Sequence, residues 1–596
     1  MASSKRRLLP ALLKPTLYEI CLEPEFKADS FNGVATIYCT VVSHTSSIRL
    51  HCTFITISAA TVDYQGSTMA IDLDSLRYDK NDETVELSVG EELRPLEEVK
   101  ISLTYTGKFK RDLEGLYQST YTANESDYCI ATTHMEPTYA RQAEFRMSAV
   151  VDLSFLCVSN MPVKHSFLLP QSKKLVVFEK TPRMSTYLVA LVTGPLAQKE
   201  AAFALDLAAK GLKLFENMFE IPFPLPKLDL AAVPDFSGGA MENWGLILSR
   251  KNCLLLDPEH SSIEKEKDVA ETVLHELAHM WFGNLVTMKY WDGLWLKEGF
   301  ATLMSCSLQQ ALELDSLNGS HPVEMEIQDA AQAKQVFDDI SYGKGCAILM
   351  MLFIDLGPDK FLKGIKLYLR RYAYDTTTSE DLWASLEEAT AEPIRERMLT
   401  WTKKPGYPVV TVTEVIDKES QRVVALHILQ NRFLSSPDRD VVGKASDDVY
   451  DLRLGIRIDS GIRMVRFNTK EMTIDISETS FIKVNADHTA FCRISYSTSH
   501  LKKLIKAAAG NKLTLRDSIG LSRDIEALVA AGINRTSDLL DLSLGLMPRK
   551  EYLVWEIIHR NLQAVGSAFK FHDASITNGL RKAVTDIVGP KSHELG

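Results

Sequence analysis

ETVLHELAHMWF, residues 271–282, contains two histidines four positions apart, His275 and His279, with Glu276 directly after the first. Successive helical residues turn by about 100°, so the two imidazoles lie on one face of a helix, one turn apart. Two neutral imidazoles suit Zn²⁺, and a glutamate between them reaches the position at which water binds. The stretch therefore predicts a catalytic zinc helix, and the alternative is a helix with two surface histidines.

A third ligand is expected at Glu298, which follows His279 by 19 residues in the stretch WLKEGFA, residues 295–301. That stretch has the pattern of a second apolar helix, and a lone glutamate at a helix start more often interacts only with the helix dipole. Two histidines and one glutamate leave a coordination position open for water, as in catalytic zinc sites. We therefore expect one Zn²⁺ per chain, held by His275, His279 and Glu298.

Upstream, residues 238–245 read GGAMENWG. Small residues let a backbone run close to a bound peptide, and Glu242 offers a carboxylate to a cation. Taken alone, this stretch is typical of a glycine-rich turn. Its significance depends on the zinc set further along the chain.

Length and composition limit the class of protein. The 596 residues suggest about four domains and exclude a single small binding module. The net charge of −11, without a long basic block, argues against general nucleic-acid binding. The apolar stretch behind residues 5–7 is too short for a secretory signal, and the longest apolar run, residues 346–354, is too short for a membrane span. Nine scattered cysteines without a CxxC pair indicate reduced thiols, so we expect a cytoplasmic protein that does not bind membranes.

The apolar pattern changes along the chain. Short β-branched and aromatic runs predict an antiparallel sheet domain up to about residue 197, and helical periods dominate from there to about residue 404. The cluster KPGYP, residues 404–408, breaks the last helix and introduces a small sheet domain that runs to residue 497. The remaining segment, residues 498–596, has helical periodicity throughout.

The combination of GAMEN (residues 239–243), HELAH and a glutamate 19 residues further on resembles the M1 family of zinc aminopeptidases, which are gluzincins. The resemblance extends over KPTLY (14–18), THMEPT (133–138) and FDDISYGKG (337–345), and the sequence is similar to the cytosolic puromycin-sensitive branch. It implies a multidomain α+β fold in shortened form. The implied parts are an N-terminal β-sandwich-like domain (1–197), a thermolysin-like zinc catalytic domain (198–404), a small β-sandwich (405–497) and a truncated C-terminal α-helical domain (498–596).

The resemblance also implies a role for each site residue. It makes His275, His279 and Glu298 the zinc ligands and Glu276 the general base that takes a proton from zinc-bound water. Tyr342 would donate a hydrogen bond to the tetrahedral oxyanion.

Two further glutamates would select the substrate. Glu136 and Glu242 would hold its free α-ammonium, because carboxylates desolvated by a peptide need a cation and an internal peptide segment supplies none. The other substrate-binding residues that the resemblance implies are Gly239, Ala240, Met241, Asn243 and His134. The family usually has glutamine in place of His134, which affects the expected preference for the first residue.

Three functions remain open at this stage. The first is a zinc aminopeptidase that removes N-terminal amino acids from peptides with a free N-terminus by zinc-activated water attack. The second is a catalytically weak or inactive truncated homologue that binds zinc and peptide, which the loss of a family stretch around residues 142–147 and the short C-terminus favour. The third is a zinc endopeptidase, which would use HELAH but would not need Glu136 and Glu242. The sequence predicts no oligomeric state.

Overall fold

The computed structural model describes residues 8–123, 125–137, 142–195, 201–257, 259–305, 309–436, 448–476 and 479–595. The chain forms two compact units. The first consists of residues 1–306, 326–338 and 362–389, and the second of residues 307–325, 339–361 and 390–596. Three predicted features lie outside the described residues: the basic residues 5–7, Thr138 and the boundary at residues 197/198.

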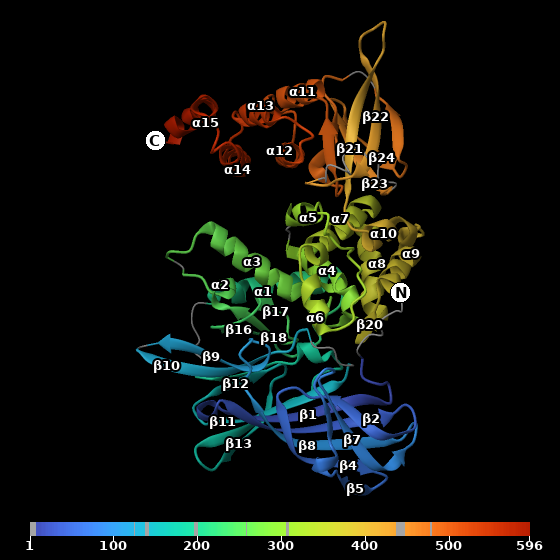
Figure 1. Ribbon diagram of the computed structural model, residues 1–596, viewed down its shortest axis with the longest axis vertical. Coiled ribbons are helices and arrows are strands. Elements are labelled where there is room, and N and C mark those ends of the chain that lie inside the picture. Colours follow the sequence, from blue (N-terminus) through green and yellow to red (C-terminus); the bar gives the residue numbers. More distant parts are fainter. Residues whose placement is uncertain are drawn as a thin grey trace. The chain divides into compact units, whose positions relative to one another are not determined.

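The first unit begins with a large sheet (Figure 1). Its strands, in spatial order, are β13 (Val163–Leu169), β14 (Lys173–Phe178), β11 (Glu144–Asp152), β1 (Leu13–Glu25), β2 (Ser30–Val41), β8 (Glu98–Lys108), β4 (Ile55–Tyr64) and β5 (Ser67–Ala70). Strand β1 pairs antiparallel with β2 but parallel with β11, so the sheet is mixed and the expectation of a purely antiparallel sheet is wrong. Alternation of residues does not reveal the partner or the direction of a strand, which is why the parallel pair was missed.

A second, smaller sheet shares the core of the first. It consists of β3 (Thr45–His51), β7 (Thr84–Leu93) and β6 (Arg77–Asp79). Alternate residues of β7 and β8, such as Leu87 and Ile101, are fully buried in one apolar cluster that includes Ile48 of β3 and Val62 of β4. Two sheets that bury their apolar faces against each other form a sandwich.

The remaining sheets of this unit lead to the helical part. One is formed by β12 (Leu156–Ser159), β15 (Leu191–Gly194), β10 (Ser126–His134) and β9 (Gly115–Ala123). Another is formed by β16 (Asp229–Val233), β18 (Leu246–Arg250) and β17 (Ala240–Met241), and the last by β19 (Val286–Met288) and β20 (Asp375–Thr377). The helices that start in this unit are α1 (Ala202–Phe219), α2 (Lys251–Leu254), α3 (Ile263–Ala278), α4 (Trp295–Ser305), α6 (Ala330–Ala333) and α9 (Ser379–Thr390), and α8 (Pro358–Arg371) enters it.

Helix α3 is held between α1 and α4. A side chain at Gly211 of α1 would place its Cβ 2.9 Å from atoms of both Leu274 and Leu277, so glycine permits the close approach of α1 to α3. On the α4 side, the ring of Phe282 stacks on that of Phe300 with centroids 4.0 Å apart. These contacts hold the two helices that position the predicted zinc ligands.

The second unit combines two sheets with helices (Figure 1). One sheet consists of β25 (Glu471–Asp475), β22 (Val423–Arg432), β21 (Pro408–Ile416) and β27 (Arg493–Tyr496). The other consists of β24 (Gly461–Phe467), β23 (Leu452–Ile458) and β26 (Lys483–Val484). The helices are α5 (Gln309–Leu314), α7 (Gly345–Leu356), α10 (Ile394–Lys403), α11 (Thr498–Ala509), α12 (Leu515–Ala530), α13 (Thr536–Leu546), α14 (Tyr552–Ala568) and α15 (Ala574–Leu595). The predicted multidomain α+β fold, with a β-rich N-terminal part and a helical C-terminal part, is confirmed, whereas the exact bounds of the four predicted domains stay predictions.

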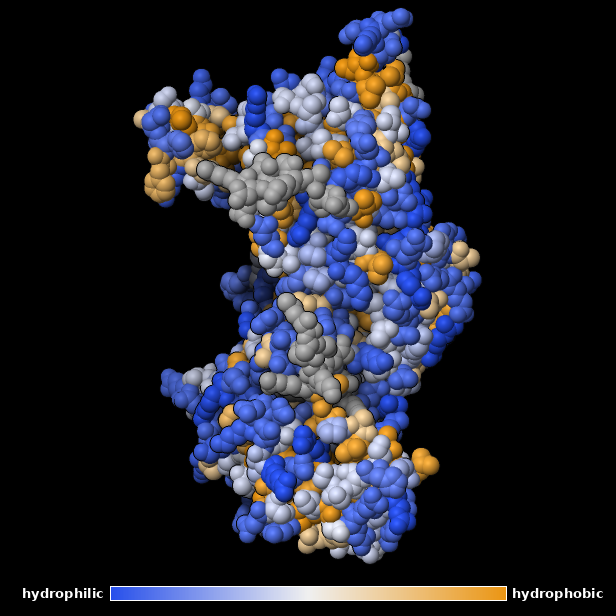
Figure 2. Space-filling view, turned by 45° about the vertical axis from the view of Figure 1, so that its right-hand side comes forward, coloured by the Kyte–Doolittle hydropathy of each residue, from blue (hydrophilic) through white to orange (hydrophobic). Residues whose placement is uncertain are grey.

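The molecular surface is mostly hydrophilic on the face that Figure 2 shows, and its apolar residues form small separate groups. One group lies just below the tip of the β21–β22 hairpin, whose exposed apolar residues are Val415, Ile416 and Val424. Within the described part of the chain, no helix has the length and apolarity needed to cross a membrane.

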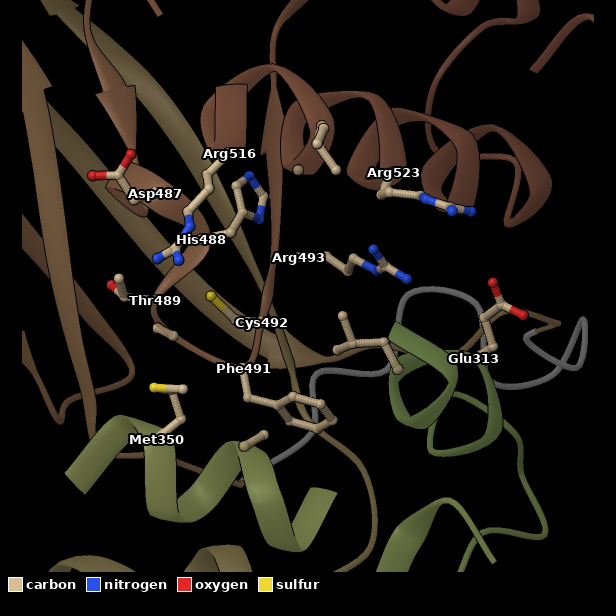
Figure 3. Close-up of a pocket in the computed structure, with 15 residues that line it drawn as sticks. Glu313, Met350, Asp487, His488, Thr489, Phe491, Cys492, Arg493, Arg516 and Arg523 are labelled. Carbon is tan, nitrogen blue, oxygen red and sulfur yellow. The ribbon is translucent and has the colours of Figure 1, made fainter. Parts of the chain in front are cut away.

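The second unit also contains a cavity of about 210 Å³. Figure 3 shows Met350 and Phe491 on its lower side and Arg516 and Arg523 on its upper side, where α12 passes. None of the residues predicted for the zinc site lines this cavity. It is therefore distinct from the candidate site.

Candidate metal centre

The helix that contains the HELAH motif has a well-defined start. Ser262 precedes α3, and its hydroxyl accepts a hydrogen bond from the backbone N–H of Lys265, while Glu264 and Glu266 lie in the positively polarised first turn. The helix ends at Ala278, so His275 lies in its last turn and His279 directly after it. The predicted helix is therefore formed, with both histidines at its C-terminal end.

The two imidazoles point their Nε2 atoms at the same place. These atoms are 3.1 Å apart. Nδ1 of His279 lies 2.9 Å from the carbonyl oxygen of Phe282, to which it donates a hydrogen bond. A ring that donates through Nδ1 keeps Nε2 as its free lone pair, which is the usual arrangement in histidine ligands of metals.

Glu298, in the first turn of α4, completes the set of donor atoms. Its Oε2 is 3.2 Å from Nε2 of His275 and 3.5 Å from Nε2 of His279. Ligands about 2.0 to 2.2 Å from a tetrahedral zinc ion would be roughly 3.3 to 3.6 Å from one another. The three observed separations, 3.1, 3.2 and 3.5 Å, are close to that range. The residues present therefore fit Zn²⁺.

The electrostatics around Glu298 and His279 also favour a cation next to them. Burial acts to raise the pKa of Glu298, but Lys297 and His279 hold it well below its usual range, so the carboxylate is ionised. Burial likewise acts to lower the pKa of His279, yet the carboxylates of Glu242 and Glu298 raise it to about 9. Positive charge next to His279 is thus stabilised by buried carboxylates.

Glu276, the residue directly after His275 on α3, lies close to His279 as well. Its side chain is buried, and its Oε2 has no hydrogen-bond partner among the described residues. Burial raises its pKa well above the usual range for a carboxyl group. Ligand atoms of Glu276, Glu242 and His279 lie within 4.8 Å of one another. A carboxylate of raised pKa next to a metal site suits proton transfer near neutral pH.

An unexpected lysine lies beside the metal centre. Nζ of Lys297 is 2.6 Å from Oε1 of Glu136, 2.6 Å from Oε1 of Glu242 and 3.0 Å from Oε1 of Glu298. The lysine side chain is almost fully buried. Sequence reasoning did not single out Lys297, although a lysine directly after two apolar residues, Trp295 and Leu296, at the start of a buried helix was a signal for it.

The two glutamates predicted to bind the substrate amine are brought together around this lysine. Glu136 lies in the turn after β10, and Glu242 follows β17. Burial raises the pKa of Glu136 to about 7. Burial acts in the same direction on Glu242, but the positive charges of Lys297 and His279 lower its pKa.

The rest of the GAMEN stretch borders the same site. Ala240 and Met241 form strand β17, which pairs only with β18 and is an edge of its sheet in the described structure. The backbone N–H of Arg250 in β18 donates a hydrogen bond to the carbonyl oxygen of Gly239. Asn243 is fully buried, with its amide group facing the carbonyl oxygen of Tyr187. An edge strand can align an extended peptide.

The two remaining predicted site residues are His134, which belongs to the first unit, and Tyr342, which belongs to the second. His134, at the end of β10, has Nδ1 2.8 Å from Oγ of Ser237, and its ring contacts that of Phe236. Burial lowers its pKa, and the charges of Glu242 and Lys297 also act on it. Tyr342 is half-buried in the π-helical turn η6 (Ile340–Lys344), which belongs to the second unit. Its role at the metal centre stays a prediction.

Family models match most of the chain. They are the peptidase M1 N-terminal domain at residues 14–188, the peptidase family M1 domain at residues 203–401 and the ERAP1-like C-terminal domain at residues 481–596. Curated relatives include Aminopeptidase 2 of Candida albicans, 34% identical over all of this chain and 68% of the relative. Alanine/arginine aminopeptidase of Saccharomyces cerevisiae is 35% identical over 99% of this chain and 73% of the relative. Puromycin-sensitive aminopeptidase of Caenorhabditis elegans is 30% identical over all of this chain and 68% of the relative.

The chain belongs to the M1 family of peptidases. The predicted family and the aminopeptidase class are therefore confirmed, and zinc dependence is general in the M1 family. The chain spans about two thirds to three quarters of the length of these relatives. Within it, Glu136 falls in the M1 N-terminal match, and the zinc set, the GAMEN stretch and Tyr342 fall in the M1 domain match.

Proposed function

We propose that this chain removes N-terminal amino acids from peptides and that His275, His279 and Glu298 hold one Zn²⁺ ion for that reaction. The observation that carries the proposal is the triangle of three donor atoms with sides of 3.1, 3.2 and 3.5 Å, next to the buried carboxyl group of Glu276. The family membership supports the same reaction class.

Each side chain of the site has a stated task in this proposal. When bound, Zn²⁺ supplies a Lewis acid that polarises the scissile carbonyl. Glu276 accepts a proton from the attacking water at its carboxylate and passes that proton to the leaving amine. Tyr342 donates a hydrogen bond to the oxygen that becomes negatively charged.

Substrate selection depends on the other glutamates and on the edge strand. In this proposal Glu136 and Glu242, which lie together around Lys297, bind the substrate's N-terminal ammonium, and the edge of β17 aligns the peptide backbone. Met241 and His134 border the position of the first side chain. The expected partners are therefore peptides with a free N-terminus. A cytoplasmic location remains part of this proposal, and one curated relative is named a mitochondrial aminopeptidase.

The test measures turnover and metal content on the same purified sample. We expect hydrolysis of leucyl and arginyl fluorogenic amides and close to one zinc per chain. Glu276→Gln should keep the zinc and lose turnover by about two orders of magnitude or more, because the proton acceptor is gone. Glu271→Gln, five positions earlier on α3 and with 33% of its side chain exposed, is the matched control and should behave like the unsubstituted chain.

Each other outcome contradicts a particular part of the proposal. Stoichiometric zinc without turnover would favour the catalytically weak homologue that binds zinc and peptide. Cleavage within N-acetylated peptides, at rates similar to those for free peptides, would favour an endopeptidase. Undiminished turnover in Glu276→Gln would reject the general-base assignment.

A further inference from the structure

A lysine ammonium already lies where the proposed function would bring the substrate's N-terminus. Nζ of Lys297 is 2.6 Å from one carboxylate oxygen of Glu136 and 2.6 Å from one of Glu242, the two proposed amine anchors. A third carboxylate, that of Glu298, is 3.0 Å away. Two of the three N–H donors of this ammonium group form hydrogen bonds with Glu136 and Glu242, and Glu298 adds an ion pair.

This arrangement is compatible with a metal ion held by Glu298. The two oxygens of that carboxylate face different neighbours: Oε1 faces Lys297, and Oε2 faces the Nε2 atoms of His275 and His279. A metal ion at Oε2 and the ammonium at Oε1 therefore do not compete for the same atom. The position of Lys297 does not depend on an incomplete metal site.

The lysine is also held in place. Only 1% of its side chain is exposed, and its ammonium lies 5.1 Å from the ring centroid of Tyr187 and 5.8 Å from that of Phe337. Both rings favour a cation at this position. Because Lys297 is covalently attached to α4, its ammonium has a high effective concentration at the two anchors. A free ammonium from solution has no such advantage.

We propose that Lys297 is a specificity-determining residue whose ammonium competes with the substrate's α-ammonium for Glu136 and Glu242. The inference rests on the proposed function and extends it to substrate selection. Two cations next to the same carboxylates repel each other, whereas an acylated, uncharged N-terminus meets no such repulsion. The chain therefore distinguishes free from acylated N-termini less strongly than its two glutamates alone would allow.

The first test uses the unsubstituted chain loaded with zinc and two small probes of equal shape. They are 3-methylbutylammonium and 3-methylbutan-1-ol, whose affinities are measured by calorimetry or ligand-observed NMR. We expect dissociation constants within about threefold of each other, because the ammonium position is already filled. A preference of about tenfold or more for the ammonium would overturn the inference.

The second test removes the lysine charge. Lys297→Met should bind 3-methylbutylammonium about tenfold more tightly than the unsubstituted chain does, with unchanged affinity for the alcohol. It should also raise the ratio of kcat/KM for free over N-acetylated peptides. The matched control is Lys173→Met, because Lys173 bridges two glutamates, Glu23 and Glu25, in the N-terminal sheet.

Zinc content is measured in every variant. Unchanged or weaker ammonium binding in Lys297→Met would overturn the inference. If that variant does not fold, the comparison of the two probes on the unsubstituted chain tests the inference by itself. Neither binding measurement needs turnover. If the chain binds the probes as expected but hydrolyses no substrate, the proposed function is contradicted. The inference that Lys297 competes for Glu136 and Glu242 is then still supported.

Discussion

The turn that contains Tyr342 depends on a fully buried ion pair, which gives a prediction with a defined magnitude. Lys344, two residues after Tyr342, has its Nζ 3.0 Å from Oδ2 of Asp315, and neither residue has exposed surface. The same Nζ donates hydrogen bonds to the carbonyl oxygens of Lys404 and Gly406. Burial acts to lower the pKa of Lys344, and the carboxylate of Asp315 opposes that effect.

Lys344→Met keeps much of the side-chain volume but removes the charge. After the change, Oδ1 of Asp315 keeps its hydrogen bonds from Gly406 N–H and Ser320 Oγ, while Oδ2 has no other hydrogen-bond partner among the described residues. Removing one member of a buried ion pair costs about 3 to 5 kcal/mol. Two carbonyl oxygens also lose their donor, so we expect the upper half of that range.

Urea unfolding measures this loss. With a slope of about 3 kcal/mol per molar urea for a unit of this size, the midpoint should fall by roughly 1.5 M. Hydrogen exchange of peptides that cover η6 and α7 should be faster in the variant, which would locate the loss of stability in this part of the second unit. Lys360→Met is the control: its side chain is 56% exposed and 3.9 Å from Glu392, so the midpoint should hardly change.

A double variant separates charge from packing. Lys344→Met combined with Asp315→Asn should recover most of the lost stability, because no unpaired charge remains buried. If Lys344→Met unfolds at the same urea concentration as the unsubstituted chain, or if the double variant is less stable than both single variants, the reasoning from the buried pair is wrong.

Three further predictions concern the site and its support. Tyr342→Phe should lower kcat by about 10² to 10³ with little change in KM, because one oxyanion donor is lost, and an unchanged kcat would reject that role. Phe300→Ala removes the ring stacked on Phe282 and should destabilise the chain by about 3 to 5 kcal/mol, seen as a lower melting temperature and faster zinc loss to a chelator. Burial raises the pKa of Asp524 to about 6, above its unfolded value of about 3.9, so its contribution to stability is complete below pH 4 and is lost as the pH rises through 6. Asp524→Asn should therefore reduce the fall in urea midpoint between pH 4 and pH 6, and an unchanged pH dependence would contradict the assignment.

The clustering of His275, His279 and Glu298 could be predicted because each residue's place depends on local geometry or on simple chemistry, whereas their role as zinc ligands stays a prediction. The spacing of His275 and His279 is enough to place both imidazoles on one helical face. Glu298 was expected from the donor set that catalytic zinc prefers. The structure brings these three side chains to within 3.5 Å of one another.

The surroundings of the ligands were harder to predict because they depend on contacts between distant segments. Lys297 and Glu136 are 161 positions apart in the chain, and no periodicity indicates that they meet. The parallel pairing of β1 with β11 was missed for the same reason. Tyr342 could be recognised from its motif, but neither its motif nor its spacing indicates the π-helical turn in which it lies.

The place of β1 in the middle of its sheet has a consequence for biosynthesis. Glu19 in β1 forms an ion pair with Arg146 in β11, 127 residues later. At 5 to 20 residues per second, a ribosome needs about 6 to 25 s to make that intervening chain. During this time one edge of β1 has no partner strand and is exposed to other nascent chains. Slower translation between residues 25 and 144 should therefore lower the yield of folded protein, and an extra chaperone that binds extended segments should restore it.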